Sequence, residues 1–298
     1  SIPNIMDGLK ISLRKIIYSA FKKNLINEIK VAQFSGYVSE HSGYHHGEAS
    51  LNGAIVGMAQ NFVGSNNINL LLPNGQFGTR LQGGKDSASE RYIYTLLNPI
   101  TRLIYNINDD KILQYLDDDG LLVEPIYYIP IIPMILVNGT KGIGTGFSTD
   151  IPCYNPKDII RYIQCKVKDN EYEEEPFTPY YKEFKGTIEK IETNKYISKG
   201  KYHVKNKKII IDELPIGMWN EEYIIHLDKC LNGKLRDYKD QSTDKDIYFE
   251  LSLNEEMTND EFDKYFKLTT NISTSNMNLF DNEEKLKHYN NVIEICND

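Results

Sequence analysis

The spacing of apolar residues predicts three helices near the start of the chain. Between Ile11 and Asn24 the apolar residues recur at helical spacing and leave the basic residues on another face. These basic residues are Arg14, Lys15, Lys22 and Lys23. Similar spacing predicts a short helix from about Glu28 to Ser39 and a longer one from about Gly47 to Phe62. Three helices with a tight glycine turn resemble a helix-turn-helix, in which the second helix of the pair enters the major groove of DNA.

The following segments add a helix and a strand to this domain. The run from Ile93 to Ile107 predicts a helix, whereas the run from Tyr127 to Val137 is apolar and β-branched and contains two prolines. Prolines in such a run favour an edge or irregular strand. Both segments fit a winged-helix-type domain with added strands. A further helix is predicted from Lys157 to Lys166.

An acidic run marks a change in the chain. Glu171 to Glu175, followed by Pro176 and Pro179, predicts a surface crossing between two domains. Beyond it, strand-like and helix-like segments are mixed, which predicts an α+β domain. The strand-like segments are Gly186–Glu192, Lys195–Val204, Lys208–Ile211 and Ile247–Leu253, and the helix-like ones are Asn220–Leu231 and Asn259–Phe266.

The composition indicates a soluble protein of two domains. The chain has 298 residues, of which 40% are hydrophobic and 26% are charged, enough to bury a sizeable core. No apolar run reaches the roughly 18 residues of a membrane span, and no signal-peptide pattern opens the chain, so we expect an intracellular protein without a membrane partner. The cysteines lie singly, which predicts neither a zinc site nor a disulfide framework. They are Cys153, Cys165, Cys230 and Cys296.

The charge is unevenly distributed along the chain. The net charge is −8, yet residues 1–100 contain nine Lys or Arg and six Asp or Glu, so this part carries +3 and the remainder −11. Such asymmetry suggests that the first part meets a polyanion while the second stays solvated.

A glycine-rich stretch from Asn74 to Thr95 is the strongest candidate for binding chemistry. Glycines let the backbone approach a ligand closely, and Arg80, Lys85 and Arg91 supply positive charge. Tyr92 is a possible covalent nucleophile, but a phenol with a pKa of about 10 is mostly neutral and needs a neighbouring cation or base. Arg91 could be that cation.

A histidine-rich segment leaves two interpretations open. His41 and His45, spaced i, i+4, together with Glu48 suggest a metal site and a metal-dependent hydrolase. Gly43 and Gly47 argue against a continuous helix that would hold these ligands rigidly. The alternative, which we favour, is a polar cluster that faces DNA.

Two further motifs each have a chemical and a structural interpretation. The segment Gly142–Gly146 resembles a nucleotide loop but lacks the spacing of a dinucleotide site. Ile143 between its glycines could instead be an apolar wedge that unstacks base steps. Asp117 to Asp119 could hold magnesium, but because Gly120 follows, we favour a solvated turn.

Several ordered motifs closely resemble the breakage-reunion region of eukaryotic-type topoisomerase II. They are KVAQ (30–33), YHHGE (44–48), AQNFVGSNN (59–67), GQFGTR (75–80), GGKD (83–86), RYI (91–93), IPIIPM (129–134) and GIGTG (142–146). Weaker matches continue through Tyr181–Glu189, Glu213–Pro215, Trp219, Asn276–Met277 and Leu279–Asp281, so the resemblance covers essentially the whole chain.

The resemblance implies an α+β chain of three parts. Residues 1–155 would form a winged-helix (helix-turn-helix) DNA-cleavage domain, residues 156–286 an α/β tower domain, and residues 287–298 the start of a coiled-coil arm. The implied activity is that of an ATP-hydrolysing type II DNA topoisomerase, an isomerase that breaks and reseals both DNA strands for strand passage.

The resemblance also assigns roles to individual residues. Tyr92 would attack a DNA phosphodiester to form a 5′-phosphotyrosyl link, with Arg91 stabilising the transition state and His46 binding the reacting phosphate. Ile143 would be the wedge that bends DNA. Lys10, Tyr44, Ser50, Lys85, Trp219 and the run Lys267 to Asn276 match DNA-contacting positions. From the residues themselves we also expect Arg14, Lys15, His45 and Arg80 to contact DNA.

The chain departs from the family pattern at two places and lacks other parts of the family. Glu90 replaces the proline that usually precedes the Arg-Tyr pair, which puts a negative charge near the nucleophile, and Ile11–Leu13 replaces a Pro-Gly-Gln motif. Neither the magnesium motifs of the TOPRIM domain nor an ATPase domain is found. We therefore expect Mg²⁺ and ATP to bind to other parts of the enzyme, with no metal site in this chain.

The resemblance implies partners as well. They are double-stranded DNA, a second copy in a homodimer, and the TOPRIM and ATPase parts of the same enzyme, in the nucleus or another compartment of DNA replication. The alternative function is a non-catalytic DNA-binding or DNA-bending module, in which Arg91 and Tyr92 only contact phosphate.

Overall fold

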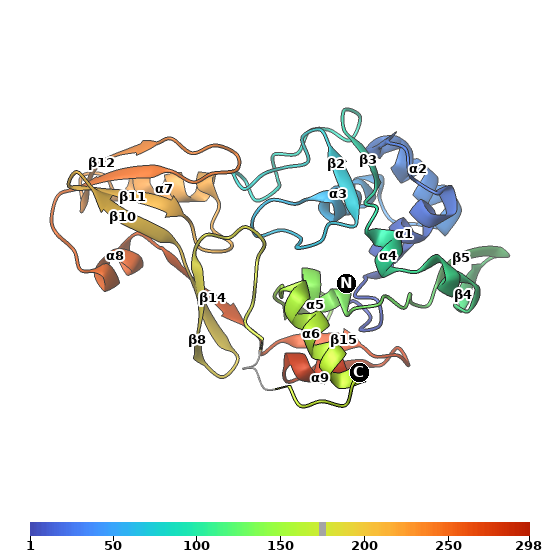
Figure 1. Cartoon of the computed structure of the whole chain (residues 1–298). Coiled ribbons are helices and arrows are strands. Elements are labelled where there is room, and N and C mark those ends of the chain that lie inside the picture. Colours follow the sequence, from blue (N-terminus) through green and yellow to red (C-terminus); the bar gives the residue numbers. More distant parts are fainter. Residues whose placement is uncertain (173–176) are drawn as a thin grey trace.

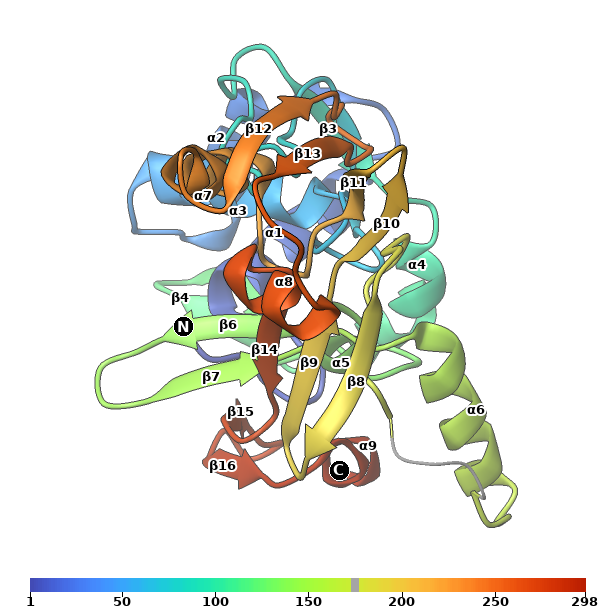
Figure 2. The same cartoon turned by 90° about the vertical axis from the view of Figure 1, so that its left-hand side faces the viewer.

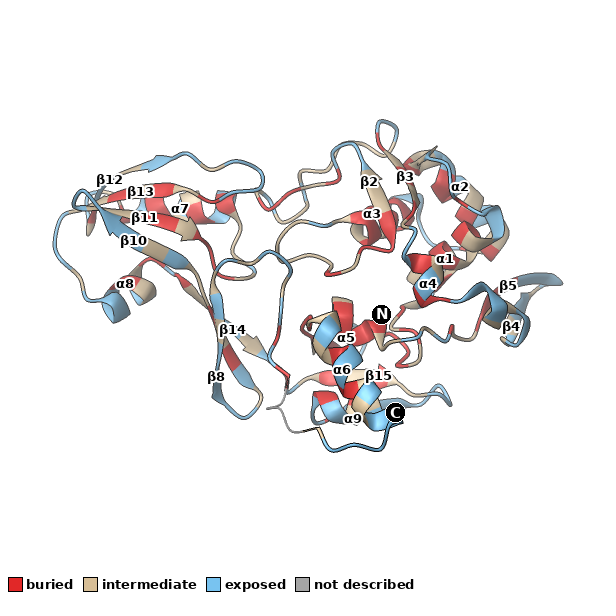
Figure 3. Cartoon of the chain, viewed as in Figure 1, coloured by how far each residue is buried: buried red, intermediate tan, exposed pale blue. Residues whose placement is uncertain are grey.

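The computed structural model describes residues 1–172 and 177–298, and these form two lobes joined by extended chain (Figure 1). Among the described residues, buried apolar side chains gather in two clusters, one in each lobe (Figure 3). We call them the first and the second cluster. Glu173 to Pro176, part of the predicted crossing, lie outside the described residues.

The predicted helices of the first lobe are confirmed as α1 (Ile11–Lys23), α2 (Val31–Ser42) and α3 (Glu48–Ala59). Their apolar faces form the centre of the first cluster, because side chains at helical spacing share one face. The turn between α2 and α3 begins at Gly43, whose φ of 61° is left-handed. A larger side chain there would be strained and would displace the Asp118 carboxylate.

A small sheet replaces the helix predicted from Ile93 to Ile107, so that prediction is wrong. The strand β3 (Tyr94–Leu97) lies between β1 (Ile29–Lys30) and β2 (Leu71–Asn74), with Leu97 opposite Leu71 and Tyr94 opposite Asn74. Only after Pro99 does the short helix α4 (Thr101–Ile104) begin, followed by the 3-10 helix η1 (Ile107–Lys111). Burial alternates along β3, a period of two that its pairing with β2 enforces.

The predicted turn at Asp117 to Asp119 is confirmed. It joins β4 (Tyr115–Asp118) to β5 (Leu121–Pro125) through Asp119 and Gly120, both with positive φ. The strand predicted from Tyr127 to Val137 is wrong, because residues 126–133 are irregular and the short helix α5 (Met134–Asn138) follows. Met134 to Val137 are buried on every side, which requires apolar residues without any helical or strand period.

The rest of the first lobe comprises a hairpin, a helix and the end of the chain. The hairpin pairs β6 (Thr140–Ile143) with β7 (Ser148–Ile151). The predicted helix is confirmed as α6 (Pro156–Val167), whose first turn Asn155 caps by accepting a hydrogen bond from Lys157 N at 3.0 Å. The strands β15 (Met277–Phe280) and β16 (Leu286–Tyr289) pair, and α9 (Val292–Asn297) follows.

The second lobe is built from two sheets and two helices, as the mixed pattern predicts. One sheet has the order β14-β9-β8, made of β14 (Thr269–Ser273), β9 (Lys195–Lys199) and β8 (Thr187–Glu192). The other has the order β10-β11-β13-β12, made of β10 (Lys201–Lys205), β11 (Lys208–Glu213), β13 (Phe249–Leu253) and β12 (Leu235–Asp240). Side chains of α7 (Asn220–Cys230) and α8 (Asn259–Tyr265) complete the second cluster.

The two clusters divide the chain differently from the boundaries expected at residues 155 and 286. Ile159 and Tyr162 of α6 belong to the first cluster, and so do Met277, Tyr289 and Ile295 near the end of the chain. The chain therefore leaves the first lobe after α6, forms the second lobe and returns. Residues 287–289 lie in β16 and precede the helix α9.

No helix within the described ranges is long and apolar enough to cross a membrane.

Candidate functional site

Tyr92 extends into solvent from a backbone that is fixed on both sides. Its side chain is 70% exposed, whereas the next residue, Ile93, is 1% exposed. The carbonyls of Ile93 and Glu90 accept hydrogen bonds from Val31 N at 3.0 Å and Ala32 N at 3.1 Å. These amides belong to the first turn of α2 and have no partner within the helix. The start of α2 thus holds the backbone that presents Tyr92.

Arg91 places a permanent cation beside the tyrosine. Its guanidinium carbon lies 5.7 Å from the centroid of the Tyr92 ring, and its side chain is exposed. A guanidinium in this position can stabilise negative charge that develops on a phosphate next to the phenol oxygen.

The loop before Tyr92 is tightly folded. Thr79 N donates to Asp86 Oδ1 at 2.8 Å, and Gly84 N donates to Thr79 O at 2.9 Å. Gln60, just after α3, donates to the carbonyls of Phe77 at 2.9 Å and Gly84 at 3.3 Å. Lys85 is exposed on this loop.

Arg80 does not share that exposure, so the expectation that it contacts DNA requires correction. Its side chain is 5% exposed and forms an ion pair with Glu213, which is 1% exposed. A guanidinium held in a buried pair cannot reach a phosphate without breaking that pair, which is costly.

Arg14 and Lys15 require the same correction. Arg14 Nε pairs with Asp7 Oδ2 at 2.6 Å inside the first lobe. Burial opposes the charge of Arg14, but the hydrogen bond and the attraction from Asp7 outweigh it and raise the pKa. Lys15 Nζ lies 2.6 Å from Glu124 Oε1 and is mostly buried. Their charges are therefore neutralised within the protein.

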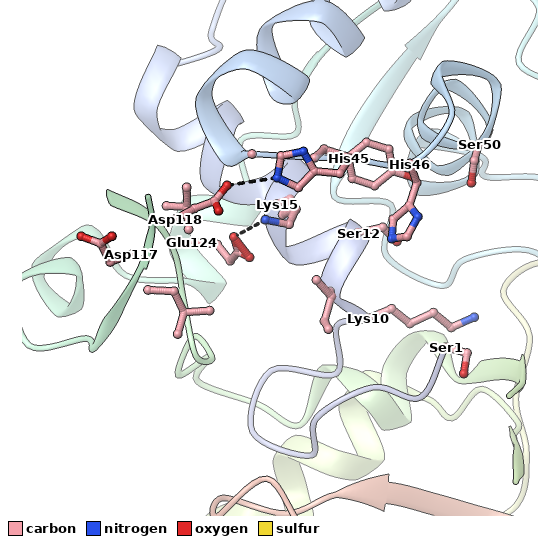
Figure 4. A pocket seen from close by; sticks show the side chains of 15 residues that line it. Ser1, Lys10, Ser12, Lys15, His45, His46, Ser50, Asp117, Asp118 and Glu124 are labelled. Carbon is pink, nitrogen blue, oxygen red and sulfur yellow. Dashed lines mark hydrogen bonds and ion pairs between the residues drawn. The ribbon is translucent and has the colours of Figure 1, made fainter. Parts of the chain in front are cut away.

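Other residues predicted to contact DNA line an open groove of about 650 Å³ (Figure 4). Lys10, Tyr44, His45, His46 and Ser50 all line it. In Figure 4 His45 points to Asp118, with its Nε2 3.2 Å from Oδ2, and Lys10 lies beside Ser1.

Among the predicted DNA contacts in the groove, Lys10 is anchored by a hydrogen bond, and His46 and Ser50 are exposed polar side chains. Lys10 Nζ donates to Lys141 O at 2.7 Å, and burial lowers the Lys10 pKa. His46 and Ser50 are exposed at the start of α3, whereas Tyr44 is buried and its ring lies 5.4 Å from that of His46. Arg91 and Tyr92 are not among the residues that line this groove.

Ile143 is the most exposed large apolar side chain among the described residues, at 86%. It ends β6 at the tip of the β6–β7 hairpin, which projects from the body of the protein in Figure 2. Gly144 N donates to Phe147 O at 2.8 Å and closes the tip. Because Gly142–Gly146 joins two strands, it lacks the strand-to-helix context of a nucleotide loop.

The predicted contacts of the second part come from different segments, although Trp219 and Asn271 to Ser273 line one pocket. Asn276 braces the hairpin, since its Nδ2 donates to Ser148 Oγ at 2.9 Å and its carbonyl accepts from Asp150 N at 2.8 Å. Lys267 is exposed just after α8. Trp219 is half-buried and packs edge-on against Phe62, with ring centroids 5.6 Å apart.

The histidine segment does not assemble a metal site. The ring of His41 packs on Tyr37, with centroids 4.0 Å apart, while His45 turns to Asp118. Across residues 1–172 and 177–298, no group of three or more His, Cys, Asp or Glu side chains could hold a metal ion.

Comparison with known proteins identifies the family. A family model that describes the A subunits of DNA gyrase and topoisomerase IV matches residues 1–298. The chain belongs to the type II DNA topoisomerases.

Individual topoisomerases match over nearly the whole chain. DNA topoisomerase 2 of Arabidopsis thaliana is 51% identical over 97% of this chain and 20% of its own length. DNA topoisomerase 2-alpha of Cricetulus griseus is 46% identical over 100% of this chain and 20% of its own length. The chain thus spans about a fifth of the length of these topoisomerases.

A solved topoisomerase structure has the same fold. It is titled the crystal structure of Plasmodium falciparum topoisomerase II DNA-binding, cleavage and re-ligation domain. The match has a TM-score of 0.96 and 47% identity and covers 100% of this chain and 42% of that chain. The predicted resemblance and the mixed helix-and-sheet class are therefore confirmed.

Sequence reasoning missed the contacts made by four residues, although Gln60, Asp118 and Glu213 lie in segments that it singled out. Asp7, Gln60, Asp118 and Glu213 fix Arg14, the glycine-rich loop, His45 and Arg80, respectively. Three of these four partners are more than 15 residues away in sequence, so no local pattern marks them. Asp7 is seven residues before Arg14 but lies outside α1. The spacing rules for side chains on one helix therefore do not apply to this pair.

Proposed function

We propose that this chain is the DNA-gate segment of a type II topoisomerase, which binds and bends duplex DNA and cleaves it through Tyr92. The observation that carries the proposal is the exposed Tyr92 beside Arg91 on a backbone fastened to α2. Because the chain spans about a fifth of its relatives, the complete reaction is proposed for the whole enzyme.

The proposed reaction is a transesterification. The phenol oxygen of Tyr92 attacks a DNA phosphorus atom, an O–P bond forms, and the bond from phosphorus to the 3′ oxygen breaks. The phenol proton is lost, and the departing 3′ oxygen takes up a proton to become a hydroxyl. Since one phosphoester replaces another, the 3′ hydroxyl can reverse the step and reseal the strand.

Three residues would assist this step. Arg91 would stabilise the charge that gathers on the phosphoryl oxygens, where a fixed cation acts most strongly in the transition state. His46, exposed at the start of α3, would donate a hydrogen bond to the reacting phosphate. Lys10, which lines the same groove as His46, would bind the DNA backbone next to the reacting phosphate.

Ile143 would bend the DNA. An apolar side chain inserted between base steps unstacks them and kinks the duplex, and the exposed tip of the β6–β7 hairpin supports this role. Bending brings more backbone phosphates to the protein, which helps a net-acidic chain to hold DNA.

The remaining DNA contacts would be polar and mostly directed at the backbone. In the first lobe they are Tyr44, His45, Ser50 and Lys85, and in the second they are Trp219 and Lys267. Asn276 lies where the chain returns to the first lobe. We assign the first lobe to a winged-helix domain and the second to a tower domain. Arg14, Lys15 and Arg80 are left out because their charges are neutralised within the protein.

The whole enzyme would supply what this chain lacks. Mg²⁺ and ATP are proposed to bind to the TOPRIM and ATPase parts, because the described residues offer no metal-binding group. We assign no step of the reaction here to a metal. A homodimer would present two copies of Tyr92, one to each DNA strand, in the nucleus or another compartment where DNA is replicated.

Replacement of the nucleophile tests the proposal. In the full-length enzyme, Tyr92→Phe should bind duplex DNA with an affinity within about twofold of the wild type, since one hydroxyl is lost among many backbone contacts. On a denaturing gel, however, labelled DNA should no longer remain attached to the protein. Persistent attachment in this variant would refute the assignment, and wild-type enzyme that never attaches would favour a non-catalytic binding module.

A further inference from the structure

The loop that carries Tyr92 is fastened to the second lobe through the buried pair of Arg80 and Glu213. Glu213 ends β11 and is itself fixed, because its carboxylate accepts hydrogen bonds from Lys185 N at 3.2 Å and Leu214 N at 2.9 Å. A carboxylate with this many partners has a set orientation. The guanidinium that pairs with it is therefore held in one place as well.

Backbone contacts strengthen this connection between the two lobes, which we call the joint at Arg80. Asn220 N and Glu221 N, in the first turn of α7, donate to Arg80 O at 3.3 Å and Leu81 O at 3.0 Å. First-turn amides have no partner within their own helix. The carbonyls of the first-lobe loop therefore supply the hydrogen-bond acceptors that these amides of the second lobe lack.

A glycine allows the two lobes to meet closely. Gly83 has a φ of 63°, and the space a side chain would need there is occupied by the indole of Trp219. That indole also packs edge-on against Phe62 of the first lobe. The joint is thus closely packed as well as ion-paired.

The chain from this joint to Tyr92 has little freedom. The Thr79–Asp86 and Thr79–Gly84 hydrogen bonds close the loop just after Arg80, and Ala88 N donates to Gln76 O at 2.8 Å. Tyr92 N in turn donates to Ser89 O at 2.9 Å. A series of short hydrogen-bonded turns therefore connects Arg80 to Tyr92.

We propose that Arg80 is a positioning residue, which ties the Tyr92 loop to the second lobe through Glu213 and does not bind DNA itself. The position of the second lobe then sets the position of the nucleophile. This inference rests on the proposed role of Tyr92.

The test compares three variants of the full-length enzyme, Arg80→Gln, Glu213→Gln and the double variant. For each, we would measure the fraction of duplex DNA attached to protein at saturating DNA with Mg²⁺, the Kd for duplex, its dependence on salt, and the Tm. Arg102→Gln is the matched control. It removes an ion pair with Asp110, 2.8 Å long, that lies within the first lobe.

Each single variant should lower the attached fraction about tenfold, because it leaves a buried partner uncompensated and the loop displaced. The Kd should stay within about twofold, and its salt dependence should not change, since no phosphate contact is lost. The double variant removes both charges. Because the two partners are coupled, its attached fraction should recover to within about threefold of the wild-type value. The Arg102→Gln control should keep the wild-type attached fraction.

Other results would overturn the inference. A phosphate contact at Arg80 would weaken binding and reduce the salt slope by about one, with Glu213→Gln without effect and the double variant no better than Arg80→Gln. Wild-type attachment in both single variants would also contradict it. If Arg80→Gln does not fold, Arg80→Lys keeps the charge but loses the paired donors, and an unchanged attached fraction there would refute positioning. Failure of the wild-type enzyme to attach would count against the role of Tyr92 itself.

Discussion

The side chain of Tyr92 is free while its backbone is not. Its ring is exposed to solvent beside Arg91, and the carbonyls on either side bind the first turn of α2. A nucleophile presented in this way keeps its position without being buried, so it remains open to a large substrate such as duplex DNA. This combination distinguishes it from buried tyrosines such as Tyr105 and Tyr154.

Glu90 is the unusual neighbour of this tyrosine. Its carbonyl binds Ala32 N, and its half-buried carboxylate lies 3.5 Å from Ser89 Oγ. Glu90→Gln keeps the shape and the carbonyl but removes a negative charge near a reaction centre that becomes anionic. We predict cleavage about twofold to threefold faster at low salt, measured as the initial rate of DNA attachment.

The effect of Glu90→Gln should shrink at high salt, because salt screens a charge that is partly open to solvent. Glu48→Gln, at the exposed start of α3, is the control for a general change in DNA affinity. Equal acceleration in both variants, or slower cleavage in Glu90→Gln, would contradict a local effect of Glu90.

At the scale of elements, local patterns predict most of the helices and most strands of the second lobe, but not the strands of the first lobe. The helices α1, α3 and α6 follow apolar spacing that their own residues determine. The pattern around β3 wrongly predicts a helix, because the conformation of this strand depends on its pairing with β2, whose residues are 20 or more positions away. Likewise, Arg14, Arg80 and Lys85 are all basic residues in the sequence. Only their partners in the folded chain, such as Glu213, distinguish a buried cation from an exposed one.

The β6–β7 hairpin is an element whose function can be tested by itself. Ile143→Ala shortens the proposed wedge without touching the strands, so we predict a smaller DNA bend, measured by fluorescence transfer between the ends of a labelled duplex. Affinity should fall about threefold, since a straighter duplex presents fewer of its backbone phosphates to the protein.

An exposed apolar residue on another hairpin provides the control. Val204 in β10 is 71% exposed and lies in the second lobe, so Val204→Ala should bend DNA like the wild type. An unchanged bend in Ile143→Ala would refute the wedge.

At the scale of the whole molecule, the two lobes bring together segments that are far apart in the sequence. Segments from residue 277 onward return to the first cluster, and Asn276 hydrogen-bonds to the hairpin that carries Ile143. The family motifs predicted the membership and the mixed class of fold. Neither the return of the chain nor the joint at Arg80 follows from any motif, because both depend on packing between segments that are remote in sequence.

The most direct measurement is to identify the residue that becomes attached to DNA. The full-length enzyme would be incubated with duplex DNA and Mg²⁺, denatured, and digested with protease and nuclease, and the modified peptide would be sequenced by mass spectrometry. We predict a nucleotide joined through its 5′ phosphate to Tyr92, within the peptide that also contains Ile93. A nucleotide on another residue, or a link through the 3′ phosphate, would contradict the assignment of Tyr92 as the nucleophile.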